Sequence, residues 1–287
     1  MQNKTMAHHP TRPINRRQGL ALLAGGLAAP AWAQLKTGEN PDASPRWLQV
    51  RNTLFAGRDI ANDGDNVVRL DVPKRAADAG QMPLALRAQF DQSDARRIQR
   101  VWLVIDNNPS PVGAVFSFTR DSGRAEIETR VRVDEYSHVR AISETSDGRL
   151  HASTRFVKAS GGCSAPPGND AAAAQAMLGR MQLRVLTDHP APGQPALAQL
   201  AISHPNDSGF AMDQLTRQFT PPHFVRRIEV QYAGQPVFSA EVDFSVSENP
   251  NLRFFFVPRG AGELKVVVVD SKDLQFTHAL AFSPDGA

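Results

Sequence analysis

The sequence contains very little cysteine: among 287 residues, Cys163 alone carries a thiol. One cysteine cannot form a disulfide within its own chain, so this thiol is either incidental or has a chemical role of its own. Gly161 and Gly162 precede it, and two prolines and Gly168 follow it. Because such residues continue neither a helix nor a central strand, the segment is predicted to be a flexible arm that presents the thiol. The alternative is a small buried side chain, as free cysteines usually are.

Long apolar runs are also absent. About 20 consecutive apolar residues are needed to span a bilayer, and the run from Leu20 to Pro30 is much shorter. It follows a pair of arginines and ends in Ala31-Trp32-Ala33, which is the order of an export signal peptide of the twin-arginine type. We therefore expect residues 1–33 to be removed on export and the mature chain to be periplasmic. A short membrane-anchoring helix is the alternative.

An excess of positive charge is missing once this leader is set aside. The whole chain has 32 basic and 29 acidic residues, and four of the basic residues lie within residues 1–33, which contain no acidic residue. The remaining 28 basic and 29 acidic residues give a formal charge of −1. Binding to nucleic acid therefore has no electrostatic support.

The composition divides the chain into two halves. Residues 159–175 are rich in Ala, Gly, Ser, Pro and Asp and lack hydrophobic periodicity. They are predicted to form a cysteine-bearing arm and linker between residues 34–158 and residues 176–287. Helices are expected only at residues 45–55 and 170–178, the second of which contains a run of alanines.

Apolar and polar residues alternate in both halves. The clearest case is residues 125–133, whose period of two is typical of a strand with one face in a core and one in water. Such runs recur about every 8 to 12 residues with turn residues between them, which favours β-sandwiches. The chain is therefore predicted to be all-β, with an immunoglobulin-like β-sandwich in each half. The expected strands are residues 101–105, 114–118, 125–133, 139–143, 150–157, 181–187, 196–203, 223–232, 236–246, 252–257 and 263–270.

Histidines at metal-ligand spacing are lacking, since no H-x-x-x-H pattern occurs, and neither a metal nor another cofactor is expected. His204 lies between Ser203 and Pro205 at a strand end, where a structural hydrogen bond or an interface contact is the favoured interpretation. An enzyme would require His204 or His223 to fold next to Cys163, which the sequence leaves open. We do not expect an enzyme, because a nucleophile on a mobile arm lacks the fixed geometry that catalysis requires.

Two sets of motifs are similar to those of a known pair of subunits. The first set is Val101 to Pro109, Gly123 to Arg132, Ser146-Asp147-Gly148, and Val157-Lys158 leading into Gly161-Gly162-Cys163. The second set is Ile202 to Pro205, Pro222 to Val225, Glu248-Asn249-Pro250, and Phe254-Phe255-Phe256. The first half resembles the SoxY subunit of the sulfur-oxidation carrier, and the second half resembles its SoxZ subunit.

The resemblance implies two immunoglobulin-like domains that pair within one chain, with apolar strand faces buried between them. It further implies a carrier that holds a sulfur-containing intermediate covalently on Cys163. The family arm is a terminal Gly-Gly-Cys-Gly-Gly, whereas here it reads Gly-Gly-Cys-Ser-Ala-Pro and is internal. This arrangement most resembles the single-chain SoxYZ-like carriers associated with quinoprotein dehydrogenases. The implied partners are periplasmic sulfur-oxidation enzymes, c-type cytochromes or such a dehydrogenase, and a non-covalent binding or scaffolding module is the alternative.

Overall fold

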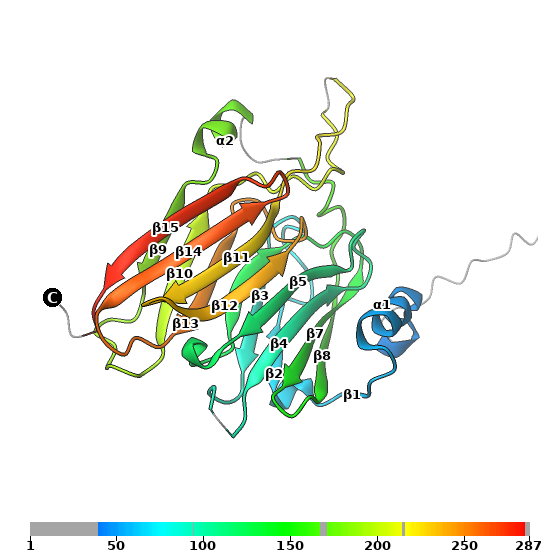
Figure 1. Ribbon diagram of the computed structural model, residues 1–287. Coiled ribbons are helices and arrows are strands. Elements are labelled where there is room, and N and C mark those ends of the chain that lie inside the picture. Colours follow the sequence, from blue (N-terminus) through cyan, green and yellow to red (C-terminus); the bar gives the residue numbers. More distant parts are fainter. Residues whose placement is uncertain (1–39, 94, 167–170, 214–215, 285–287) are drawn as a thin grey trace, which may run out of the picture. The chain divides into compact units, whose positions relative to one another are not determined.

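Two β-sheets run through both halves of the chain in the computed structural model (Figure 1). The structure describes residues 40–284, except residues 94, 167–170 and 214–215. The expected signal peptide and Gly168 therefore lie outside the described residues. The helices among these residues are too short or too polar to span a bilayer.

The elements of the described residues confirm the all-β prediction, and every strand expected from the sequence is present. The strands are β1 (Ile60–Ala61), β2 (Val68–Asp71), β3 (Met82–Ala88), β4 (Ile98–Ile105), β5 (Val112–Phe118), β6 (Ile127–Val131), β7 (Ser137–Thr145), β8 (Leu150–Val157), β9 (Met181–Val185), β10 (Ala196–Ile202), β11 (Val225–Tyr232), β12 (Gln235–Val242), β13 (Asn251–Phe256), β14 (Gly262–Asp270) and β15 (Gln275–Phe282). The helices are α1 (Pro45–Phe55), α2 (Ala171–Met177) and short 3-10 helices at Pro41–Ala43, Gly64–Asn66 and Arg120–Ser122. Strands β1, β2, β3 and β15 were not expected from the sequence.

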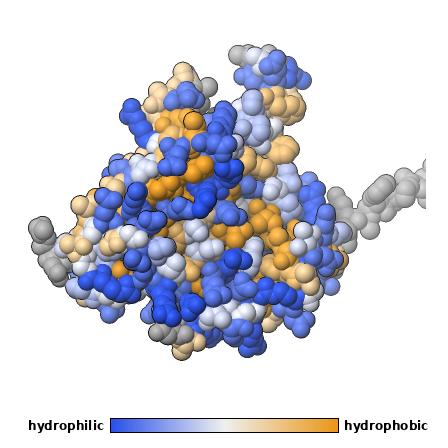
Figure 2. All heavy atoms as spheres, in the orientation of Figure 1, coloured by the Kyte–Doolittle hydropathy of each residue, from blue (hydrophilic) through white to orange (hydrophobic). Residues whose placement is uncertain are grey.

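In the described part of the chain, the larger sheet has nine strands in the order β1-β8-β7-β4-β5-β12-β11-β14-β15, and the smaller sheet has six in the order β2-β3-β6-β13-β10-β9. Figure 1 views the larger sheet from its outer side, with the first half in blue to green and the second half in yellow to red. Figure 2 shows this face as apolar patches broken by hydrophilic side chains.

The two halves are joined by strand pairing at their edges. β5 pairs antiparallel with β12, with Phe116 opposite Ala240, and β6 pairs antiparallel with β13, with Ile127 opposite Phe254. Both sheets therefore continue from one half into the other, and the buried apolar side chains form a shared core. The expected pairing within one chain is confirmed. The halves meet at strand edges as well as through apolar side chains, because pairing satisfies the peptide groups that two separate sandwiches would leave open.

The alternation of side chains decides which residues enter the core. In β10, every second residue is buried, beginning with Ala196, as expected for a strand with one face inside. In β13, Phe254 and Phe256 are 1% and 0% exposed, whereas Phe255 faces the other side and is partly exposed. The aromatic run is therefore mostly core, as its position in a strand predicts.

Helix α1 covers part of the outer face of the larger sheet (Figure 1). It begins after Ser44, whose Oγ accepts a hydrogen bond from Trp47 N at 3.3 Å, and a proline occupies its first turn. Trp47 and Phe55 bury their rings, and Phe55 packs edge-on against Trp102 with ring centroids 5.1 Å apart. These contacts form a second, smaller apolar cluster on the outer face.

Candidate functional site

The chain reaches Cys163 shortly after β8 and turns back against the first half. Gly161 N donates a hydrogen bond to Asp134 O at 2.7 Å, and Gly162 N donates one to Val133 O at 3.1 Å. These bonds hold the arm along the segment that follows β6. Cys163 is consequently 1% exposed. The expectation that this segment presents the thiol to solvent is wrong for this structure, because backbone pairing ties the segment down.

Gly162 explains how the arm approaches so closely. A Cβ atom at this position would lie 2.2 Å from Ala79 O and 2.6 Å from Val133 O, so a side chain does not fit. Gly161 has φ of +76°, a conformation that glycine adopts without strain. Both glycines thus permit tight backbone packing in this structure, and their expected role in arm flexibility remains a prediction.

Both halves of the chain hold the cysteine. Asp134 of the first half accepts a hydrogen bond from Cys163 N on its Oδ1 at 3.2 Å. Ser208 of the second half donates from its Oγ to Cys163 O. The cysteine therefore lies at the seam between the two halves, although the first half supplies it.

The surroundings keep the thiol protonated. Burial is the main cause that raises the pKa of Cys163 to about 12, and the carboxylates of Asp134 and Asp243 raise it further. The guanidinium of Arg132 acts in the opposite direction but does not compensate. Since the thiolate is the reactive form of cysteine, we expect the thiol to react slowly in this conformation, which is called closed below.

Arg132 links the halves next to Cys163. Its side chain, in a residue 6% exposed, donates to Phe244 O at 2.9 Å and to Val246 O at 2.8 Å. Burial lowers the pKa of Arg132, and the nearby acidic groups Glu248, Asp207 and Asp243 oppose this effect, as does Cys163 when it is ionised. The guanidinium thus supplies the positive charge among several acidic groups at the seam.

Asn108 is fully buried and hydrogen-bonds to the residues that surround Cys163. Its Nδ2 donates to Arg132 O at 2.9 Å and to Ser245 Oγ at 3.1 Å, and its Oδ1 accepts from Asp134 N at 2.9 Å. The residues that hold the cysteine are defined here as the thiol seat. The thiol seat consists of Asn108, Arg132, Asp134 and Ser208.

A cluster of His204, His223 and Asp270 lies in the second half, with one potential ligand atom from each within 4.8 Å of the others. His223 Nε2 is 2.7 Å from Asp270 Oδ2, and His204 Nε2 is 3.6 Å from the same oxygen. His204 Nδ1 accepts a hydrogen bond from Asn206 N at 3.0 Å. A neutral His204 must then carry its proton on Nε2, which leaves that nitrogen without the lone pair that a metal needs. The geometry therefore does not favour a metal site.

The histidine cluster supports the loop that contributes Ser208. Asn206 donates from Nδ2 to Val246 O at 2.9 Å and accepts from Val225 N on Oδ1 at 2.8 Å, while His204 caps its backbone nitrogen. Among the described residues, the side-chain contacts of His204 and His223 run to this network rather than to Cys163. The alternative of a Cys-His catalytic set is thus not assembled in this structure.

Two groups, His204 and Asp243, are expected to make the free energy of unfolding depend on pH in opposite directions. Burial, with His223 as the next cause, lowers the pKa of His204 from 6.5 to about 4, despite opposing contacts with Asp270 and Asn206. The unfolded chain then binds the extra proton more readily, so the free energy of unfolding falls as pH falls from 6.5 to 4. Burial raises the pKa of Asp243 from 3.8 to about 6, although Ser110, Ser245 and Arg132 act to lower it. Its contribution therefore falls as pH rises from 3.8 to 6.

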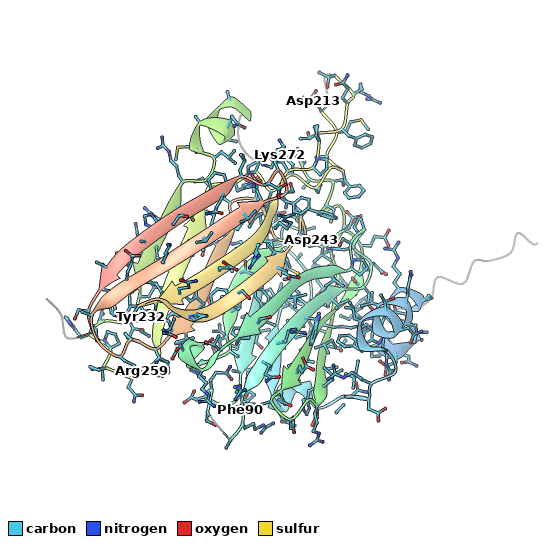
Figure 3. The ribbon with its side chains drawn as sticks, viewed as in Figure 1. Phe90, Asp213, Tyr232, Asp243, Arg259 and Lys272 are labelled. Atoms are coloured by element: carbon cyan, nitrogen blue, oxygen red, sulfur yellow. The ribbon has the colours of Figure 1, made fainter. Side chains whose placement is uncertain are left out.

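Single substitutions separate the two effects. Asp243 lies beyond the end of β12 between the halves (Figure 3), and its buried Oδ2 has no hydrogen-bond partner among the residues that the structure describes. Asp243→Asn should stabilise the protein at pH 7.5 by up to about 3 kcal/mol, because the cost of ionising a buried carboxyl disappears.

His204→Gln should reduce the decrease in the free energy of unfolding that accompanies a fall in pH from 6.5 to 4. Urea unfolding monitored by circular dichroism at several pH values measures both, and unchanged pH profiles in both variants would contradict this account.

Both halves of the chain are similar to known protein families. Two family models match, "Sulfur oxidation protein SoxY" over residues 51–163 and "Sulphur oxidation protein SoxZ" over residues 183–281. None of the curated proteins matches the chain. A superoxide reductase (neelaredoxin) from Ignicoccus hospitalis matches 32% of this chain and 78% of its own at 12% identity and a TM-score of 0.29. A β-glycosidase from Bacteroides vulgatus matches 75% of this chain and 25% of its own at 10% identity and a TM-score of 0.22. These TM-scores are too low to carry an argument.

The fold and the thiol seat define a protein of two immunoglobulin-like halves with one cysteine at the end of the first. The chain belongs to the SoxY and SoxZ sulfur-oxidation carrier family, with both domains in a single chain. The residues of the thiol seat come from both domains, since Asn108, Arg132 and Asp134 lie in the SoxY match and Ser208 lies in the SoxZ match.

Proposed function

We propose that the protein is a periplasmic covalent carrier that holds a sulfur-containing intermediate on Cys163 and presents it to partner redox enzymes. The observation that carries this proposal is that the SoxY match ends at Cys163, the sole thiol of the chain. Periplasmic sulfur-oxidation enzymes or c-type cytochromes are the proposed partners, and a quinoprotein dehydrogenase is a further one. The chain itself is proposed to be a carrier rather than a catalyst.

The chemistry requires only a nucleophilic sulfur. A Cys163 thiolate attacks the outer sulfur of a donor persulfide, the S–S bond of the donor breaks, and the donor leaves as a thiolate. The product is a Cys163 persulfide, and no external oxidant is needed because sulfane sulfur is merely transferred. Release occurs by the same exchange with a thiol of the next partner.

Loading requires the thiol to leave its seat. The arm is held by backbone bonds from Gly161 and Gly162, by Asp134 on Cys163 N and by Ser208 on Cys163 O. These are few local bonds, so the arm can open without unfolding either sheet. In the open state the pKa of the thiol would return toward about 8.5, where a useful thiolate fraction exists.

The burial of Cys163 favours a second candidate, a non-covalent binding or scaffolding module in which the thiol is incidental. Loading experiments separate the two functions. The wild-type protein, incubated with cysteine persulfide and analysed by intact mass spectrometry, should gain the mass of one sulfur atom at Cys163.

Cys163→Ser should gain no sulfur, because a serine hydroxyl is not ionised near neutral pH without an activating base. Ser208→Ala is the matched control that keeps the thiol and weakens its seat, and it should load faster than the wild type. If the wild type and Ser208→Ala both stay unmodified, the carrier function is wrong and the scaffolding function replaces it. Circular dichroism of each variant checks that it remains folded.

A further inference from the structure

The two sheets end in four edge strands among the described residues, and three of these edges are protected. β1 has only two residues. β2 has four and carries Arg69 and Asp71, and β9 has five and carries Arg184. Short length and charged side chains are the usual means by which proteins prevent an open strand from pairing with another chain.

The fourth edge, β15, has none of these protections. Its eight residues, Gln275–Phe282, include no Asp, Glu, Lys, Arg or Pro. It pairs with β14 at eight consecutive positions without a bulge, from Gln275 opposite Val269 to Phe282 opposite Gly262. Figure 1 shows β15, in red, at the outer edge of the larger sheet. About half of its peptide groups point away from β14, because alternate residues of an antiparallel pair bond outward.

The two faces of β15 differ in a way that suits continued pairing. Phe276, Leu280 and Phe282 are partly buried against the core, and the intervening positions are exposed. The exposed positions carry Gln275, Thr277, Ala279 and Ala281, which are uncharged and mostly small. An added strand would therefore meet apolar side chains on one face and little steric obstruction on the other.

We propose that β15 pairs antiparallel with β15 of a second copy of this chain, about a two-fold axis that passes beside Ala279. Residues directly opposite in an antiparallel pair lie on the same face of the sheet. Because side chains alternate along β15, the two residues of each pair must both be odd-numbered or both even-numbered. Centring on Ala279 places Phe276 opposite Phe282 and His278 opposite Leu280. This register extends the apolar face of both cores and sets aromatic rings across from each other.

A second copy is favoured over a strand of another protein because β15 is self-complementary. A strand with a net charge would repel its own copy, and β15 contains no charged residue apart from a titratable histidine. The same lack of charge gives it no electrostatic means to select an acidic or basic partner. The two-fold pairing also closes, so each dimer consumes its open edge and does not grow into a fibre.

Sedimentation equilibrium of the purified chain tests the proposal. The wild type should show a concentration-dependent mass that rises to twice that of one chain. The double substitution Thr277→Lys with Ala279→Lys should remain monomeric, because it places the two lysines at position 279 directly opposite each other and adds a further positive charge to each strand at position 277. Gln182→Lys, which adds a lysine at an exposed position of a different edge strand, β9, is the control and should still dimerise.

Cross-linking tests the register. In the antiparallel pair, the Cα atoms of Ala279 and its copy would lie about 4.5–5.5 Å apart, within the range of a disulfide. Ala279→Cys should therefore form a disulfide-linked dimer under mild oxidation. Thr277→Cys should not, because its copy would lie about 13 Å away along the strand. The parent chain, whose Cys163 is buried, is the control.

Three outcomes would overturn the proposal: a wild type that is monomeric at every concentration, a double lysine variant that still dimerises, or equal cross-linking of both cysteine variants. None of them bears on sulfur loading at Cys163, so this inference and the carrier function stand or fall separately. Circular dichroism of the lysine variants verifies that the monomers are folded.

Discussion

Cys163 in the folded protein is expected to react with iodoacetamide at least about a thousandfold more slowly than an unhindered cysteine at pH 7.5. The reason is its protonation state, since burial beside Asp134 raises the pKa of Cys163 to about 12. A thiol of pKa about 8.5 is roughly 10% thiolate at this pH, whereas one of pKa 12 is ionised to only a few parts in 10⁵. Exclusion of the reagent from a residue that is 1% exposed adds to this effect.

The dependence of the labelling rate on urea identifies the motion that releases the thiol. If the arm leaves its seat by local opening, low urea concentrations should hardly change the rate, because little surface is exposed. If release requires global unfolding, the rate should rise steeply with urea. Ser208→Ala should accelerate labelling in native buffer, because it removes the bond from the second half to Cys163 O. Rapid labelling of the native wild type would show that the thiol is not closed.

A closed thiol has a consequence for the carrier function. A persulfide is labile, and a thiol that is exposed at all times would be oxidised or would exchange with unrelated thiols. Retention at the seam would restrict exchange to the moments when the arm is open. Because Ser208 belongs to the SoxZ domain, both domains hold the cysteine that the SoxY domain carries, and each would take part in such a restriction.

The strands could be predicted from local pattern, and the exceptions have local causes. Residues 125–133 alternate with a period of two, and β6 forms within them. β3 was missed because Pro83 interrupts a run that otherwise resembles a strand. β15 was missed because Ala279 and Ala281 occupy its exposed side, so polar and apolar residues no longer alternate clearly.

The thiol seat could not be predicted because its contacts are distant in sequence. Two glycines before a cysteine indicate conformational freedom, yet Gly162 is glycine because its backbone lies against Ala79 O, 83 residues earlier. The strict alternation of residues 125–133 places Arg132 on the face toward water. In the structure, the second half covers that position, and Arg132 is 6% exposed. Only the pairing of β6 with β13 reveals this, and sequence pattern does not contain it.

Arg132→Met should destabilise the protein by about 3–5 kcal/mol, which is the usual cost of removing one partner from a buried charged network. The methionine fills a similar volume but leaves Phe244 O and Val246 O without their donor. It also removes the positive charge that offsets Asp207 and Asp243 at the seam. The loss should be smaller near pH 5 than at pH 7.5, because Asp243, whose pKa is about 6, is then largely protonated.

Arg130→Met is the matched control, since Arg130 lies two residues earlier on β6 and is exposed. A surface substitution of this kind usually changes stability by less than about 0.5 kcal/mol. Urea unfolding of both variants gives the comparison, and iodoacetamide labelling reports the seat directly. Arg132→Met should label faster than Arg130→Met even in native buffer. The reason is that the substitution removes the guanidinium that joins the two halves next to the cysteine-bearing arm. Equal stability and equal labelling of the two variants would mean that Arg132 neither joins the domains nor holds the thiol closed.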